Sequence, residues 1–490
     1  MLLKFCILLV AILLSSSLAT GQKNMSESNF SSAIVLIPRY LDTREVSTVD
    51  EYVILRHLNI TLVKHDLKAS IQGYLAQSWK ISDDFKEYSF YLSDRFFSDG
   101  TPILAKDVVD SIRLQMAFGK TIHFDFNRIL KIEEIDKKGV KFTLKEPDKY
   151  FLNQVRQPEF GILHYSQINR EVGKSTFSVT SGPFSVKSRT DSNIALKRNR
   201  FFSDWINHSP EDFEFIAHND TNIGELIKSK KLLSLDAMST ESIHNTEKEG
   251  YKLYQPRSSQ TFFLALNGKS KWLQDEQLRR YLVKIVRQVD FSQNFGLIAS
   301  RANQLFYPGG PSLLSPTELE ALWSGIESTE KPKTFPKVLN FLSGTRGITP
   351  PMLKSALEKA GFTIERNSFE SQFFDEALKK GDFDLVLISS DFASTELLEN
   401  ILVATGKGKP ILLNSKSKIP ALIAAAHEEF SGAKRQDFVK SIGFNLVHEG
   451  FVAPLVYFNR IYLVNPDYDT SNWSQFYPDV SIWRMPKLKK

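Results

Sequence analysis

Two Gly-Lys-Ser triplets are the nearest match in this sequence to a known catalytic motif. They are 173–175 and 268–270, and a Gly-Lys-Ser sequence ends the loop that cradles nucleotide phosphates. That loop also needs a glycine five positions before the first glycine of the triplet, where the main chain approaches the phosphates. Ile168 and Phe263 occupy those positions, so neither triplet predicts a nucleotide site.

Signals for hydrolytic or metal chemistry are also weak. The sequence contains no His-Glu-x-x-His and no Gly-x-Ser-x-Gly, and its one cysteine, Cys6, lies near the start. The 9 histidines are dispersed; His57 and His65 fit one face of a helix, but no third metal ligand is near them. We therefore expect no catalytic residue, no metal site and no cofactor.

The first residues predict a secretory signal peptide over residues 1–21. A lysine precedes an apolar run at 5–14, and small residues follow it, with cleavage after Ala19 and after Gly21 both open. The run is short for a membrane-spanning helix. Because Cys6 lies inside the run and not after it, we expect no lipid anchor. We therefore expect a periplasmic or secreted protein that has no disulfides and is stabilised by burial of its hydrophobic core.

Composition argues against a nucleic-acid partner. The formal net charge is only +6 over 490 residues, and basic residues alternate with acidic ones along the chain. The one basic run, at 487–490, is explained by a solvated chain end. The length predicts more than one domain.

A β-hairpin is predicted over residues 79–92. Apolar side chains alternate with polar ones in its second half, at Tyr88, Phe90 and Leu92, which is the period of a strand with one buried face. The polar residues at 82–84 supply the turn.

A helix is predicted directly after the hairpin. Residues 99–102, Asp-Gly-Thr-Pro, end the sheet, and Val108, Ile112 and Met116 then recur at helical spacing. We interpret this tetrapeptide as scaffold, with glycine permitting the turn and proline preceding the helix. Leu104 precedes this helix and has no hydroxyl that could cap it, and the missing cap costs the helix about 1 kcal/mol.

A βαβαβ pattern is predicted in the second half of the chain. Strands are expected at 337–342, 362–366 and 383–388, and the helices between them at 352–360 and 370–380 each end at a glycine, Gly361 and Gly381. The apolar run inside the last strand is typical of a parallel sheet covered on both faces. Two helices near 419–430 and 434–448 and a strand at 452–459 follow.

This order of elements resembles that of the family 5 extracellular solute-binding proteins, the peptide, dipeptide and nickel receptors of ABC importers. The resemblance covers nearly all of residues 30–485. Its motifs here are Leu75-Ala-x-Ser-Trp-x-x-Ser-Asp-Asp84, Phe97-x-Asp-Gly-Thr-Pro102, Asp107-Val-Val-x-Ser111, Ser181-Gly-Pro-Phe184, Arg198-Asn199, Leu264-Ala-Leu-Asn267 and Leu278-Arg-Arg-Tyr281.

The resemblance implies an α/β protein with two lobes, the type II periplasmic-binding-protein fold in its large family 5 variant, with an extra subdomain inserted in the first lobe. Two chain crossings near 264–268 and 454–458 would form the hinge. The implied segments are lobe I at 22–55, 175–266 and 455–490, the inserted subdomain at 56–174, and lobe II at 267–454.

The resemblance also implies a ligand site. In peptide-binding relatives an Asp in a Gly-Trp-x-Ala-Asp-Tyr segment takes the peptide's amino terminus, and it falls on Asp391 here. The other implied contacts are Phe392, Phe262 and Tyr457 on the inner rim, and Arg39 and Tyr40 after the first strand. Simpler interpretations stay open: Asp391 as a helix cap, the aromatic residues as core, and Arg39 as a solvated side chain. The Trp of the family motif is Ile388 here, so peptide specificity does not carry over directly.

The function that the resemblance implies is capture of a small ligand, with an oligopeptide as the leading candidate, by a monomer that delivers it to a membrane ABC permease. A periplasmic sensor or adaptor on the same fold and a secreted hydrolase stay open as alternatives. The sequence gives neither the identity nor the length of the ligand, nor whether peptides bind at all.

Overall fold

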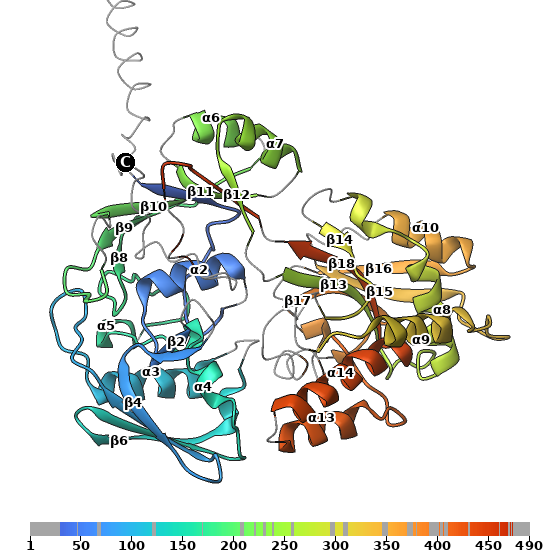
Figure 1. Cartoon of the computed structure of the whole chain (residues 1–490), viewed down its shortest axis with the longest axis horizontal. Helices are drawn as coiled ribbons and strands as arrows, with labels where there is room; N and C mark the ends of the chain where they lie inside the picture. The colour runs from blue at the N-terminus through green and yellow to red at the C-terminus, as the bar shows by residue number, and fades with distance from the viewer. Residues whose placement is uncertain are drawn as a thin grey trace, which may run out of the picture.

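Two large β-sheets, of seven and six strands, organise the molecule into two lobes (Figure 1). The structure is a computed structural model, and it describes residues 30–473 except 47, 66–69, 120–123, 169, 206–209, 220–221, 229–231, 238–239, 256–258, 295–298, 307–311, 345–350, 370–375, 379, 392–400, 402–404, 406–409, 430–431, 460, 469–470 and 472. The predicted signal peptide and Phe392 lie outside the described residues.

The first lobe is built on the seven-stranded sheet. Its central strand β1 runs parallel to both neighbours, β10 and β11, while the outer strands pair in antiparallel fashion. In order across the sheet, the strands are β12 (Lys252–Tyr254), β19 (Tyr462–Val464), β11 (Leu232–Asp236), β1 (Ser31–Ile34), β10 (Asp212–Ala217), β9 (Asn193–Arg198) and β8 (Phe184–Arg189). Helices α6 (Ile223–Lys228) and α7 (Thr240–Lys248) complete this part.

A four-stranded antiparallel sheet forms the inserted part of the first lobe. Its order is β4 (Ala76–Ile81), β5 (Glu87–Leu92), β7 (Gly139–Leu144) and β6 (Ile129–Asp136), and it confirms the predicted hairpin. The helices here are α2 (Val49–Leu58), α3 (Ala105–Phe118), α4 (Phe151–Gln154) and α5 (Tyr165–Ile168), and β2 (Val63–His65) pairs with β3 (Ile71–Gly73). Helix α3 is the one predicted after the Asp-Gly-Thr-Pro turn, and it buries Val108 and Ile112.

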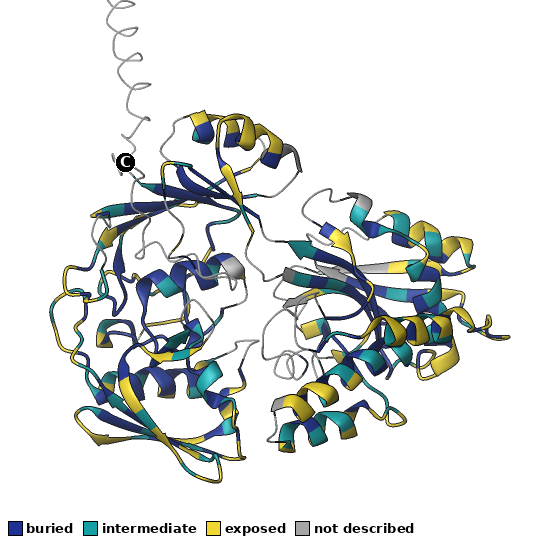
Figure 2. Ribbon diagram, viewed as in Figure 1, coloured by how far each residue is buried: buried dark blue, intermediate teal, exposed yellow. Residues whose placement is uncertain are grey.

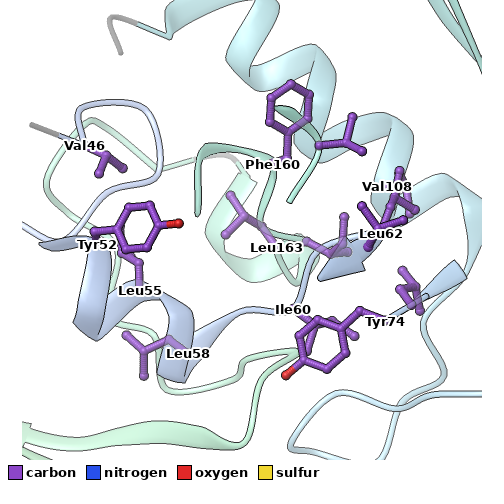
Figure 3. Close-up of a cluster of buried hydrophobic side chains, with 14 of the residues drawn as sticks. Val46, Tyr52, Leu55, Leu58, Ile60, Leu62, Tyr74, Val108, Phe160 and Leu163 are labelled. Carbon is purple, nitrogen blue, oxygen red and sulfur yellow. The ribbon is translucent and has the colours of Figure 1, made fainter. Parts of the chain in front are cut away.

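One continuous hydrophobic core joins the inserted part to the seven-stranded sheet. It extends from Val140 and Phe142 in β7, through α3 and α2, to Phe213 and Phe215 in β10. The close-up in Figure 3 shows its middle, with Leu55 of α2 on one side, Leu163 at the centre, and Leu62 and Val108 on the other side.

The second lobe is built on the six-stranded sheet. Strands β15, β16, β17 and β18 run in one direction and β13 runs against its neighbours. The order is β14 (Ala299–Arg301), β18 (Val452–Asn459), β13 (Ser259–Leu266), β17 (Leu385–Asp391), β15 (Val338–Gly344) and β16 (Thr363–Phe369). The helices are α8 (Glu276–Arg287), α9 (Pro316–Glu327), α10 (Pro351–Lys359), α13 (Ile419–Glu428) and α14 (Gly432–His448).

The second lobe has its own hydrophobic core, formed by β13, β18 and β15 with α8 and α14. Buried residues concentrate in its sheet, and exposed ones gather on α10 and α13 (Figure 2). Within the described residues, the buried cores of the two lobes are separate clusters, which is what two independently packed bodies require.

Most strands and helices of the second lobe lie within a few residues of the predicted ones. Both glycines that end its helices have positive φ, +98° at Gly361 and +70° at Gly381, as left-handed caps require. The segment between β14 and β15 contains the 12-residue helix α9. Its capping box at Ser315 and Glu318 is the signal that fixes its start. Most of the helix predicted at 370–380 lies outside the described residues.

The chain passes between the two sheets twice, and both passages are short. It leaves β12 at Tyr254 and enters β13 at Ser259, then leaves β18 at Asn459 and enters β19 at Tyr462. Strands β13 and β18 therefore belong wholly to the six-stranded sheet, whereas the expected crossings at 264–268 and 454–458 lie inside or beyond these strands. The expected lobe boundaries at 266 and 455 stay a prediction about domains.

Candidate functional site

The carboxyl edges of both large sheets lie at the passages between the lobes. In the first lobe the parallel strands β1, β10 and β11 end there, beside the start of β19, because Asp236 pairs with Tyr462. In the second lobe β17 and β18 end beside the start of β13, because Gln260 pairs with Asp391 and Ser259 with Asn459. The step from Asn459 to Tyr462 spans at most about 10 Å. Open α/β sheets bind ligands at this edge.

Internal hydrogen bonds hold the edge of the first lobe. The ring Nε2 of His218 lies 2.7 Å from the carbonyl oxygen of Asp236, and the His218 N–H donates to Ile34. Asp50, at the start of α2, accepts the Leu36 N–H at 3.1 Å. The ends of β1, β10 and β11 are thereby fixed relative to one another, as a preformed half of a binding site requires.

Asp391 is the last residue of β17, directly beside the first residues of β13. Its register partner is Gln260, which also pairs with Phe458 of β18. The structure therefore places Asp391 at the sheet edge next to a passage between the lobes. Its predicted contact with a ligand amine stays a prediction.

Phe262 lies on the face that Gln260 shares, two residues further along β13. It is half-buried, it pairs with Ser389 and Val456, and its ring centroid is 5.7 Å from that of Phe458. Ser389 is exposed. The structure thus brings an aromatic pair and an exposed hydroxyl to the same end of the sheet.

Tyr457 lies on the opposite face, because its partner in β13 is Thr261 and not Phe262. Only 2% of its surface is exposed, and its hydroxyl donates to the Gln304 carbonyl at 2.8 Å and accepts the Gln304 N–H at 3.2 Å. This placement argues against the predicted ligand contact and makes Tyr457 a core residue that holds the loop after β14.

Arg39 and Tyr40 are exposed and follow β1, as expected. The guanidinium carbon of Arg39 lies 5.5 Å from the Tyr40 ring centroid. The Tyr40 ring lies against Gly173, where an added Cβ would come within 2.6 Å of it. Gly173 has a φ of +74°, and its N–H donates to Asp42, so this Gly-Lys-Ser triplet is a turn of the first lobe. The ligand roles of Arg39 and Tyr40 stay predictions.

Three residues at this edge, Gln260, Ser389 and Phe458, are candidates for ligand contact that the sequence reasoning missed. Each lies within two positions of the predicted Phe262, Asp391 or Tyr457, in the same or a paired strand. The signal that identifies them is the period of two along β13 and its partners, and reading it needs the strand register.

Two cavities lie elsewhere, in the second lobe. One, of about 580 Å³, is lined by Trp272, Arg279 and Glu449 among others. The other, of about 1000 Å³, lies between α8 and α10. None of the predicted ligand residues lines either cavity. The sheet edges are the better candidate for a ligand site, because residues of both lobes lie beside them, whereas each of these cavities is lined by the second lobe alone.

No group of three His, Cys, Asp or Glu side chains in the described part of the chain is placed to hold a metal ion. None of the helices in that part has the length and apolarity that crossing a bilayer demands.

Two lobes, connected by two short passages at facing carboxyl edges, define the class of solute-binding proteins that hold a ligand between lobes. Residues 70–400 match the family of bacterial extracellular solute-binding proteins, family 5 Middle. The chain belongs to this family, as its motifs indicated.

Individual relatives agree with this assignment. The chain is 25% identical over 367 residues to the probable D,D-dipeptide-binding periplasmic protein DdpA of Escherichia coli, covering 67% of each chain. It superposes on NikA from Brucella suis in complex with Fe(III)-EDTA with a TM-score of 0.75, at 18% identity, covering 94% of this chain and 99% of NikA. For Haemophilus influenzae OppA complexed with RPPGFSPFR the TM-score is 0.74, at 16% identity, covering 95% and 100%. The predicted two-lobed fold class is confirmed.

Proposed function

We propose that this protein captures a short peptide outside the cytoplasm by closing its lobes around it, and delivers the peptide to an ABC importer. The observation that supports this most is the meeting of the two carboxyl edges at the passages between the lobes. DdpA, which aligns with 67% of the chain, is described as D,D-dipeptide-binding, and OppA has a similar fold and is described in complex with a peptide.

The chemistry of the edge suits a peptide in two ways. A peptide offers a cationic amine, and a carboxylate at Asp391 would bind it by a charge-assisted hydrogen bond. A peptide also has a backbone that could pair with a strand end, such as the last residues of β17, without regard to its side chains. The ring of Phe262, together with Phe392 in the segment after β17, would supply apolar contact.

Lobe closure would couple binding to delivery. Two short passages let the lobes rotate as rigid bodies, and a ligand that contacts both lobes favours the closed state by its differential affinity. The permease would then recognise the closed, loaded form. The proposed compartment is the periplasm or the exterior, the proposed state is a monomer, and no catalytic step is part of the role.

Native mass spectrometry of protein purified from its own host tests the ligand class. We expect a mass excess that denaturation releases as one peptide or a series of short peptides with intact bonds. Titration of the stripped protein with a pool of di- and tripeptides should then restore the complex. Recovery of a non-peptide solute, or no binding from the pool, would refute the peptide proposal.

A second candidate is a non-peptide solute held by the same lobes. NikA, which has the same fold, is described in complex with Fe(III)-EDTA. Ile388, one strand residue before Ser389, also replaces the Trp of the peptide-binding motif. The same mass measurement distinguishes the two candidates, because it identifies the released compound directly.

A further inference from the structure

The two lobes meet a second time, away from the passages that connect them. Helices α13 and α14 of the second lobe approach the turn before α4 in the inserted part of the first lobe, at the lower end of the view in Figure 1. There the guanidinium carbon of Arg435, in the first turn of α14, lies 3.4 Å from the centroid of the Tyr150 ring. The passages at Tyr254 and Tyr462 lie toward the other end of the molecule.

The first lobe holds its side of this contact firmly. Asp148 is 3% exposed and accepts the Tyr150 N–H at 2.9 Å, and its other carboxylate oxygen accepts from Arg128 at 2.7 Å. The Asp148 carbonyl accepts the Tyr88 hydroxyl from β5. The turn that carries Tyr150 is therefore fixed to the four-stranded sheet.

The second lobe places a buried cation against this turn. Arg435 is only 7% exposed, although it lies in the first turn of a helix with exposed neighbours on both sides. His427, in the last turn of α13, is close enough to the first lobe that Arg128 and Asp148 both act on its charge. Rotation of the lobes away from each other would separate Arg435 from the Tyr150 ring.

We propose that the stacking of Arg435 on Tyr150 is a latch, a direct closing contact between the lobes that stabilises the closed state. The proposal rests on the proposed closure function, but it concerns the lobes and not the ligand's identity. A guanidinium over an aromatic face is attracted more strongly when water is excluded from it, as it is here. The apparent affinity for a ligand that needs the closed state falls in proportion to the closed fraction.

Tyr150→Leu tests the latch, with Tyr150→Phe as the matched control. Leucine removes the ring face, whereas phenylalanine keeps it. For the ligand-free proteins, X-ray scattering should give a larger radius of gyration for Tyr150→Leu and an unchanged one for Tyr150→Phe. If a pool of di- and tripeptides binds, Tyr150→Leu should weaken it by about tenfold, which corresponds to about 1.4 kcal/mol. Equal behaviour of the two variants, with both folded by circular dichroism, overturns the latch.

A cysteine pair tests the same contact without any ligand. The chain has one cysteine, Cys6, inside the predicted signal peptide, so Tyr150→Cys with Arg435→Cys gives a mature protein with two thiols. A short bis-maleimide, which adds one thiol across each of its two C=C bonds with no leaving group, should link them within one chain, because the long Arg435 and Tyr150 side chains can meet while their Cα atoms stay too far apart for a disulfide. The cross-linked protein should stay compact in scattering. Both single variants serve as controls. If no cross-link forms, the latch is wrong; if it forms while no peptide binds to any variant, the latch stands and the peptide proposal fails.

Discussion

Phe262 and Tyr457 lie on opposite faces of the six-stranded sheet, because Thr261 is the residue of β13 that pairs with Tyr457. A shift of one residue in register reverses the face on which a strand residue lies. Two aromatic residues expected on one ligand wall therefore have different environments: the Phe262 ring packs beside Phe458, and the Tyr457 hydroxyl binds the Gln304 backbone.

Tyr457→Phe should accordingly destabilise the fold and leave ligand affinity unchanged. Removal of the hydroxyl deprives the buried Gln304 N–H and carbonyl of a shared partner, which costs about 1–3 kcal/mol. Urea denaturation measures the loss, and calorimetric titration with the native ligand measures affinity. A large drop in affinity with unchanged stability would instead place Tyr457 in the ligand site.

Asp391→Asn should weaken binding of a ligand that has a free amine. A hydrogen bond to a charged group contributes about 1.5–3 kcal/mol, so the loss should be about tenfold to a hundredfold in affinity. The same peptide with an acetylated amino terminus is the control, because it offers no cation to Asp391. Equal losses for both peptides would mean that Asp391 acts on the structure of β17 and not on the amine.

The family motifs predicted the fold well because their residues build it. Ser181 accepts the Ile60 N–H at 3.1 Å and donates to Ile162 at 2.6 Å, joining two distant segments. An added Cβ at Gly182 would lie 2.5 Å from the backbone of Leu58. Asn267 donates to the carbonyls of Gly381 and Phe383 at 2.9 and 2.7 Å, which fixes β13 beside β17. Such contacts demand particular residue types, so they leave a sequence pattern.

The candidate ligand site is harder to recognise in the sequence. Which side chains lie there depends on the register of β13 with both of its neighbouring strands. Gln260, Ser389 and Phe458 are distant in sequence and become neighbours only through pairing. A bulge between Phe262 and Phe263 shifts the register with β18, and periodicity along one strand does not reveal it. The resemblance to the family predicted which edge of the sheet holds the candidate site. It did not predict on which face of the sheet each residue of that edge lies.

Arg279→Met should lower stability without touching the ligand site. Arg279 is 1% exposed, burial lowers its pKa to about 10, and its guanidinium donates to the carbonyls of Glu449, Leu273 and Gln274. Methionine keeps most of the volume and leaves these buried acceptors unpaired, so we expect a loss of about 2–4 kcal/mol.

Urea denaturation of Arg279→Met, compared with Arg280→Met, measures that loss. Arg280 is the next residue of α8 and its side chain is 22% exposed, so its replacement should cost clearly less. Similar costs for the two variants would contradict a special role for the buried guanidinium.

Leu104→Thr should stabilise α3 by completing its cap. Leu104 is the N-cap residue and offers no side-chain acceptor, although Asp107 already accepts the Leu104 N–H at 2.8 Å. A threonine hydroxyl would accept the Asp107 N–H and so form the second half of a capping box. Leu104→Val, which has a similar shape and no hydroxyl, is the control. Thermal unfolding should favour Thr over Val by about 0.5–1 kcal/mol, and no difference between them would rule out the cap.

Closure of the lobes should depend on pH through His427. In the structure, burial lowers the pKa of His427 below the usual 6.5, Arg128 and Arg435 lower it further, and Asp148 and Glu428 act in the opposite direction. When the lobes separate, His427 returns to water and its pKa rises toward the usual value. The open state therefore binds more protons than the closed state at mildly acidic pH. Closure should be fully stable above about pH 6.5 and lose stability as the pH falls below it.

Scattering of the ligand-free protein between about pH 5 and 8 measures this dependence. The radius of gyration should increase as the pH falls through about 6.5, because protonation of His427 between Arg128 and Arg435 opposes closure. His427→Gln keeps a polar side chain that does not titrate, so its radius should stay constant over the same range. An identical increase in the variant would show that other groups carry the pH dependence, since glutamine cannot take up the proton that separates the lobes.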